Sequence, residues 1–286
     1  MTRGIDHLVL AVRDLAKARA FYEQLGFTLT PRAEHPWGTA NHLVQLNGCF
    51  LELLGVSDPA KIAPFRPGEF SFGARNRDFL AEREGMSMLV FQSRDARRDR
   101  AEFAAAGLET YAPFDFAREA KLPDGTTARV AFSLAFVTDP RMPEAAFFTC
   151  QQHAPRYFWK REFQLHANGA RGIAEVVMVA PEPAALAAFF AALQGKESVR
   201  GEDGALRVAT ARGRISVVTP PAFAARFGAA SPGPPTPHFA AFRISGVDPA
   251  AAAARLGAAG IPHRASDGTL QVPAAAAFGV AVEFAL

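Results

Sequence analysis

Residues 4–27 read GIDHLVLAVRDLAKARAFYEQLGF, and this stretch decides the fold. A short apolar strand pattern leads to Asp14, a favoured helix N-cap, and the helix pattern ends at Gly26, a favoured helix stop. The same unit occurs four times, always with 12 residues from helix start to closing glycine. Such a repeat sets the architecture of the whole chain. The later copies run over 85–108, 172–195 and 238–261, from Asp95 to Gly107, from Pro183 to Gly195 and from Asp248 to Gly260.

Each unit is followed by short strand patterns that are separated by Gly, Pro and Asn, as in residues 27–56. The second unit is longer and has a turn pattern at Pro123-Asp124-Gly125. The sequence therefore predicts an α+β fold of four βαβββ modules. We expect a first domain at 1–153, a linker at 154–171 and a second domain at 172–286. Residues 55–84 and 220–237 are rich in Pro and Gly, and we expect them to be extended connections between modules.

The composition excludes several classes of protein. A chain of 286 residues suits two domains, and 49% hydrophobic with 21% charged residues is ordinary for a soluble protein. The net charge of +3 is spread over arginines with interleaved acids, so we expect no nucleic-acid partner. No run approaches the roughly 18 apolar residues of a membrane span. Cys49 and Cys150 lie in apolar strand patterns, and buried free thiols fit a reducing cytoplasm.

Several stretches together resemble the glyoxalase-like domain proteins of the vicinal oxygen chelate superfamily. They are the opening unit, HPWGTANHLVQL (35–46), FLELLG (50–55) and FFTCQQH (147–153). The superfamily includes glyoxalase I, fosfomycin-resistance enzymes, methylmalonyl-CoA epimerase and extradiol ring-cleaving dioxygenases. The resemblance implies modules paired into two domains, each a curled mixed sheet that forms a cup with helices outside. It also implies a divalent metal in a cup, held by the first and last strands of a module.

His7 and Glu52 match two of the metal-ligand positions that the resemblance implies. Strand alternation puts His7 on the face opposite Leu8 and Leu10, so we expect it to point into the cup while the aliphatic face packs on the helix. Glu52 stands in an apolar strand and needs a cation or hydrogen bonds there. An imidazole and a carboxylate suit Zn²⁺, Fe²⁺, Mn²⁺ or Ni²⁺. A strand histidine is also commonly a satisfied core or surface residue, so a site without metal stays open.

The second module departs from this pattern. The helix frame puts Met88 at the position of His7, and Met is a poor ligand for these metals. Its last strand offers Gln151, Gln152 and His153 but no carboxylate. Among these we take Gln151 as the third metal ligand. We take His153, with Glu52, as the group that moves protons.

A polar strand entry, HPWGTANH, supplies candidate substrate contacts at His35, Trp37, Asn41 and His42, although a turn with an exposed histidine would look the same. The linker carries Trp159, His166 and Asn168, which either cap the cup or pin the two halves together. The motifs of nucleophilic hydrolases, P-loop proteins and dinucleotide-binding proteins are absent from the sequence.

The second half contains a rival set of metal donors in Glu175, His238 and Glu283. Counting back from the predicted helix starts, however, puts Val176 and Ala241 at the position of His7. A one-residue shift turns a strand side chain to the other face, so Glu175 is predicted to miss the cup. This mismatch argues against an extradiol dioxygenase. The Ala-rich, functionally plain sequence of the second half favours a structural second domain.

Two functions remain. The first is a metal-dependent isomerase or lyase that chelates a small oxygenated substrate in the first cup, where the metal acts as a Lewis acid. The second is a metal-free protein that binds a small drug-like or aromatic compound, which Met88 and the 25 Phe favour. Either protein could be a homodimer.

Overall fold

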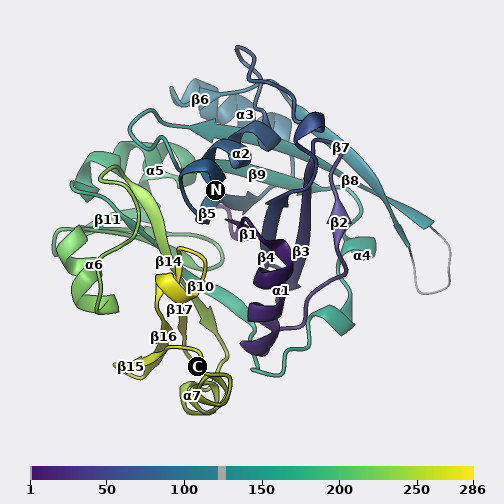
Figure 1. The fold of residues 1–286 in the computed structure, drawn as a ribbon. Coiled ribbons are helices and arrows are strands. Elements are labelled where there is room, and N and C mark those ends of the chain that lie inside the picture. The colour runs from purple at the N-terminus through teal and green to yellow at the C-terminus, as the bar shows by residue number, and fades with distance from the viewer. Residues whose placement is uncertain (1, 122–126) are drawn as a thin grey trace.

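The computed structural model describes residues 2–121 and 127–286 and shows an α+β protein built on two mixed β-sheets (Figure 1). The purple-to-teal half of the chain forms the first sheet, and the green-to-yellow half forms the second. The strands follow the βαβββ pattern that the repeat predicts, so the predicted fold class is confirmed. The turn predicted at residues 123–125 lies outside the described residues.

The first sheet pairs two modules through their first strands. Within the described residues its strands are β1 (Ile5–Ala11), β2 (Ala33–Glu34), β3 (Thr39–Gln45), β4 (Phe50–Val56), β5 (Gly85–Gln92), β6 (Glu109–Thr110), β7 (Phe114–Lys121), β8 (Thr127–Thr138) and β9 (Ala146–Gln152). β1 and β5 run antiparallel to each other, and each is parallel to the last strand of its own module, β4 or β9. The order is β2-β3-β4-β1-β5-β9-β8-β6, with β7 paired to β8. The long β7 and β8 project from the sheet edge (Figure 1).

The second sheet repeats this arrangement. Its strands are β10 (Gly172–Val179), β11 (Val199–Glu202), β12 (Ala205–Ala209), β13 (Arg214–Val218), β14 (His238–Ser245), β15 (Arg264–Ser266), β16 (Thr269–Val272) and β17 (Ala281–Phe284). The order is β11-β12-β13-β10-β14-β17-β16-β15. Here β10 and β14 are the antiparallel central pair, flanked by the parallel strands β13 and β17.

The helices begin mostly where the repeat predicts. They are α1 (Leu15–Gln24), α2 (Phe72–Glu82), α3 (Ala96–Ala105), α4 (Pro155–Phe158), α5 (Ala187–Gln194), α6 (Pro220–Phe227) and α7 (Pro249–Ala258), with short 3₁₀ turns at Pro59–Lys61, Arg161–Phe163, Pro183–Leu186, Lys196–Ser198 and Ala274–Ala276. Asp14, Asp95 and Asp248 each cap a first turn by accepting backbone N–H groups, which stabilises a helix end. In the third unit the N-cap is Glu182, one residue before the predicted Pro183.

Two connections that were predicted to be extended contain helices. Residues 55–84 hold α2, and Ser71 caps it by accepting the N–H of Ala74. Residues 220–237 hold α6, which begins with prolines at its first positions and is capped by Thr219. Proline is tolerated in a first helical turn, where its missing N–H would have no partner. A proline-rich stretch therefore did not imply an extended chain here.

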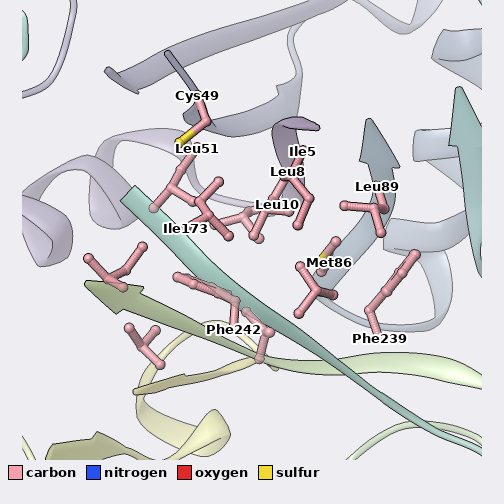
Figure 2. Packing of buried hydrophobic residues seen from close by; sticks show 14 of the residues in the cluster. Ile5, Leu8, Leu10, Cys49, Leu51, Met86, Leu89, Ile173, Phe239 and Phe242 are labelled. Carbon is pink, nitrogen blue, oxygen red and sulfur yellow. The ribbon is translucent and has the colours of Figure 1, made fainter. Parts of the chain in front are cut away.

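The two sheets share one core. The aliphatic face of the first sheet packs on α1 and α3, as predicted, and also on the matching face of the second sheet. Figure 2 shows this meeting, with Leu8 and Met86 on one side and Ile173, Phe239 and Phe242 on the other. Because these back faces are buried together, the opposite faces of the two sheets, including that of His7, form separate clusters.

The segment that links the halves is pinned to the first sheet. His166 accepts the N–H of Thr28 and donates to the carbonyl of Gln45, and the Asn168 amide donates to the Leu25 carbonyl. The pinning role expected for His166 and Asn168 is therefore present.

Cys49 and Cys150 are both buried and free, as predicted. No helix within the described ranges is long and apolar enough to cross a membrane.

Candidate functional site

His7 lies on β1 in the first cup, beside a β-bulge. The register of β1 against β5 shifts between Ile5 and His7, which leaves Asp6 as the extra residue. The Nδ1–H of His7 donates to Asp6 Oδ1 over 2.6 Å, and both side chains are buried. The ring stacks on Phe50, with 4.1 Å between the two centroids. His7 is therefore held by its neighbour and by stacking, and its Nε2 faces the cup.

Glu52 projects from β4 into the same cup. It is only 6% exposed, and Asn41 Nδ2 donates to its Oε1 over 2.6 Å. Its Oε2 lies 3.8 Å from His7 Nε2, and its Oε1 lies 3.8 Å from His35 Nε2. Within the described residues no arginine or lysine forms an ion pair with Glu52. A buried carboxylate with one hydrogen bond and two nearby imidazoles is typical of a functional group rather than a structural one.

The HPWGTANH stretch builds the network around Glu52. His35 Nδ1–H donates to Thr39 Oγ1 over 2.8 Å, so Asn41 can donate to the other ring nitrogen, 3.3 Å away. Trp37 stacks on His35, with 4.8 Å between the centroids. Burial lowers the pKa of His35, although the charge of Glu52 opposes this shift. The His35 imidazole is thus held neutral beside the carboxylate.

These side chains face one narrow cavity. The centre of a water molecule can occupy about 60 Å³ of it, which corresponds to on the order of five waters. Apart from a few polar groups, its walls are aromatic and aliphatic. The lining residues are His7, His35, Trp37, Asn41, Leu43, Phe50, Glu52, Phe72, Phe116, Arg118, Phe132, Leu134, Phe148, Cys150 and Phe158.

Three predicted site residues lie elsewhere. Gln151 points to the outer face of β9 and accepts the N–H of Ala96 at the start of α3. His153 is exposed and hydrogen-bonds to Ser133 in a shallow outer groove. His42 faces away from Asn41 and donates to the carbonyl of Thr30. The structure therefore brings His7, Glu52, His35, Trp37 and Asn41 together, and it separates Gln151, His153 and His42 from them.

Two polar residues near the cavity, Asp6 and Arg118, were missed from sequence, and Gln152 was named there but not chosen as a site residue. Asp6 is turned toward His7 by the bulge, and Gln152 donates to Asp6 Oδ2 over 3.4 Å. Alternation along β9 could have indicated Gln152 instead of Gln151, because Gln152 shares a face with Phe148 and Cys150. Arg118 comes from β7, which is far in the sequence from β1 and β4. The sequence therefore did not indicate that Arg118 lines the cavity.

The second module carries apolar residues at the two positions equivalent to His7 and Glu52. β1 and β5 pair about a local two-fold axis, with His7 opposite Val90 and Val9 opposite Met88. Met88 therefore stands where His7 stands in the first module, as predicted, and it is fully buried.

By the same two-fold relation, Phe148 stands at the position equivalent to Glu52. Glu52 lies beside Val9 on the neighbouring parallel strand, and Phe148 lies beside Val90. The edge of the Phe148 ring contacts His7, with 5.5 Å between centroids. Half of the positions that would surround a metal are thus apolar.

The donors that are present do not form a ready metal site. Two ligands of one Zn²⁺, each at about 2.1 Å, would lie roughly 3.4 Å apart, which is shorter than the 3.8 Å gaps around Glu52. Across residues 2–121 and 127–286, no three His, Cys, Asp or Glu side chains converge closely enough to hold a metal ion. His7 and Glu52 have the right chemistry for a metal, but the set around them is incomplete.

The second cup holds two carboxylates, Glu175 and Glu283, at positions equivalent to those of His7 and Glu52. The position of Glu175 corrects the predicted strand frame. Glu175 lies opposite Arg243 just after a bulge, as His7 lies opposite Val90, so Glu175 and not Val176 matches His7. The prediction was one residue off because it counted from Pro183. Ala241 does occupy the predicted position, opposite Val177.

Arginines neutralise both carboxylates of the second cup. Arg226 of α6 donates to Glu175 over 2.9 Å and to Glu283 over 2.6 Å, and Arg243 also donates to Glu283. Burial alone would raise the pKa of Glu175, but hydrogen bonds and charge, chiefly from Arg226, lower it to about 2. His238 is held by Ser231 and the carbonyl of Thr236, away from this cluster. The predicted rival metal set therefore does not converge.

Aromatic side chains of α6 also fill the second cup. Phe223 and Phe227 of α6 stack, with 4.5 Å between centroids, and they pack with Val177, Val179 and small alanines on the cup face. A cup closed in this way agrees with the structural role expected for the second half.

Comparison with known proteins gives a family and a fold. Residues 5–194 match the model of a family described as "Glyoxalase-like domain". No curated protein matches the chain in sequence. A hypothetical protein from Staphylococcus aureus has a TM-score of 0.69 at 12% identity, with 98% of each chain covered.

Two solved enzymes share the fold. A mutant of 4-hydroxymandelate synthase from Streptomyces coelicolor gives a TM-score of 0.60 at 12% identity, covering 99% of this chain and 92% of that chain. The Mn(II)-bound glyoxalase from Novosphingobium aromaticivorans gives 0.56 at 15% identity, covering 99% and 82%. At these identities the likeness concerns the fold alone.

Proposed function

This chain belongs to the glyoxalase-like domain family, and on that premise we propose that it is an enzyme of the isomerase or lyase type that acts on a small molecule in the first cup. The observation that carries the proposal is a pair of groups able to transfer protons: His7 Nε2 lies 3.8 Å from Glu52 Oε2 in a largely aromatic cavity. A buried imidazole and carboxylate that converge on a cavity are typical of acid–base catalysis.

Asp6 prepares His7 for this role. Because the Nδ1–H is donated to Asp6, the free lone pair of a neutral ring lies on Nε2, which faces Glu52. Asn41 holds Glu52 Oε1 and leaves Oε2 available. One of the two groups, His7 or Glu52, takes a proton from a carbon next to a substrate carbonyl, and the other returns a proton to the neighbouring atom.

Trp37 supplies a hydrogen bond for the charge that develops. Its indole Nε1 is buried and has no hydrogen-bond partner among the described residues. A substrate oxygen that becomes negative as the proton leaves can accept this N–H, which stabilises the oxyanion in a water-poor site.

A metal-dependent form of the same reaction is an alternative within this proposal. His7 and Glu52 would be the protein ligands of Zn²⁺, Fe²⁺, Mn²⁺ or Ni²⁺, and the metal would supply Lewis-acid chemistry. Met88 and Phe148 take the other two positions, so the residues present favour the acid–base form.

A metal-free binding protein is the second candidate function. It is favoured by the aromatic walls, by Phe148 at a ligand position and by Phe158, which the linker places over the cavity. Such a protein would need neither the Asp6–His7 pair nor an oriented Glu52, whereas the proposed enzyme uses both.

Proton exchange tests the proposal without knowledge of the natural substrate. Aryl ketones and aldehydes with a C–H next to the carbonyl, beginning with acetophenone, are incubated in D₂O, and deuterium uptake is followed by NMR. We expect catalysed exchange that falls by about 10²-fold or more in Glu52→Gln and in His7→Asn. His153→Ala is the matched control, because this exposed imidazole lies outside the cavity, and it should keep wild-type exchange.

The metal question is answered in the same assay by adding EDTA or Mn²⁺. Exchange that requires Mn²⁺ would favour the metal-dependent form. Saturable ligand binding without exchange would favour the binding protein. Exchange that persists unchanged in Glu52→Gln would contradict the proposed mechanism.

A further inference from the structure

Arg118 brings a cation to the wall of the first cavity. β7 alternates, so Phe114, Phe116 and Arg118 share one face. The two phenyl rings pack edge-on against Trp37, with centroid distances of 5.2 and 4.9 Å. Arg118 therefore continues the same wall, half-buried beside Val130 of β8.

The charge of Arg118 is unmatched in the described residues. No carboxylate oxygen described here lies within ion-pair distance of its guanidinium, whereas Arg226 of the second cup contacts two carboxylates. Burial lowers the pKa of Arg118, and the charge of Glu52 only opposes this shift. A partly buried cation that lacks a close anion is suited to an anionic ligand group.

Two residues that line the cavity, Trp37 and Asn41, each carry a buried polar atom that lacks a partner among the described residues. Asn41 is 4% exposed, and its Oδ1 accepts no hydrogen bond from the described residues. The buried Trp37 Nε1 likewise donates to none of them. Unsatisfied buried polar atoms are costly, so a donor and an acceptor on two residues that line the same cavity are the groups that a bound ligand would satisfy.

We propose that the ligand of the first cup is a small aromatic acid. Its ring lies among the phenyl side chains, its anionic group pairs with Arg118, and a second polar group meets Trp37 Nε1 and Asn41 Oδ1. The inference rests on the proposed function of this site, since it names the substrate class. Arg118 acts as a specificity residue and transfers no proton.

Binding of benzoate and of benzamide, its neutral isostere, tests this inference by ligand-observed NMR titration. We expect wild type to bind benzoate about tenfold or more tightly than benzamide, because a charged donor strengthens the contact. Arg118→Gln should abolish the preference, and Arg118→Lys should keep part of it. Arg129→Gln is the matched control, because Arg129 lies on the opposite, outer face of the same hairpin and should be unimportant. The thermal midpoint of each variant establishes that it is folded.

Three results would overturn the inference: no benzoate binding, an unchanged preference in Arg118→Gln, or an equal loss in Arg129→Gln. The test measures binding alone. A benzoate preference without catalysed exchange in the acetophenone assay would therefore contradict the proposed enzyme and leave the ligand class standing. Catalysed exchange without a preference for benzoate would contradict the ligand class and leave the proposed enzyme standing.

Discussion

The two cups share a strand order and a bulge, but they use buried carboxylates differently. In the first cup Glu52 meets Asn41 and two imidazoles beside an open cavity. In the second cup Glu175 and Glu283 are neutralised by arginines, and aromatic side chains fill the space. The comparison shows that one fold can leave a buried acid beside a cavity without an ion pair to an arginine or lysine among the described residues, or compensate it with arginines. What decides between the two is the partner that the surrounding elements supply.

The largest effect is expected from removing the shared arginine of the second cup. Arg226→Met leaves Glu175 and Glu283 buried with weaker compensation, which should cost about 3–5 kcal/mol of unfolding free energy. Urea unfolding measures the change. Arg207→Met is the control, because this exposed side chain lies 3.8 Å from Glu175 and should cost less than about 1 kcal/mol. Equal losses would show that the second cup is not held by Arg226.

The pH dependence of stability gives the next effect. The folded-state pKa of Glu175 is lowered to about 2, so its contribution is fully present above about pH 4.5 and is lost as the pH falls toward 2. Wild type should therefore lose stability across this window in urea titrations at stepped pH. Glu175→Gln should flatten that part of the curve. A wild-type curve with no slope between pH 4.5 and 2 would contradict the arginine compensation.

A small effect is expected at Gln151, outside the first cup. Gln151→Ala removes one hydrogen bond to the start of α3, which should cost about 0.5–1.5 kcal/mol. Deuterium exchange and benzoate binding should both stay at wild-type levels, since the side chain points away from the cavity. A loss of either one would return Gln151 to the site.

Most of the fold could be predicted because local chemistry repeats in the sequence. The aspartate caps and closing glycines mark the helices, and strand alternation separates the cup face from the core face. The strand frame of the third unit was predicted one residue off because the N-cap is Glu182, which makes no side-chain cap hydrogen bond, and not Pro183. The helix α6 was not predicted because the prolines at its start were interpreted as part of a linker.

The first-cup site was predictable only where its residues are close in the chain or stand at matching strand positions. His7, Glu52, His35, Trp37 and Asn41 met this condition. The bulge that turns Asp6 toward His7 has no pattern in a single sequence. Arg118 approaches from a separate hairpin, and its position follows from long-range strand pairing.

The most direct test of the comparison is the same substitution in each cup, Glu52→Gln and Glu283→Gln, with unfolding free energies measured side by side in urea. Glu283→Gln should destabilise the protein by at least about 2 kcal/mol, because Arg226 and Arg243 lose a shared buried partner. Glu52→Gln should change stability by no more than about 1 kcal/mol, or raise it, because an acid kept for function contributes little to folding. Equal losses, or a larger loss at Glu52, would contradict the division of roles between the two cups.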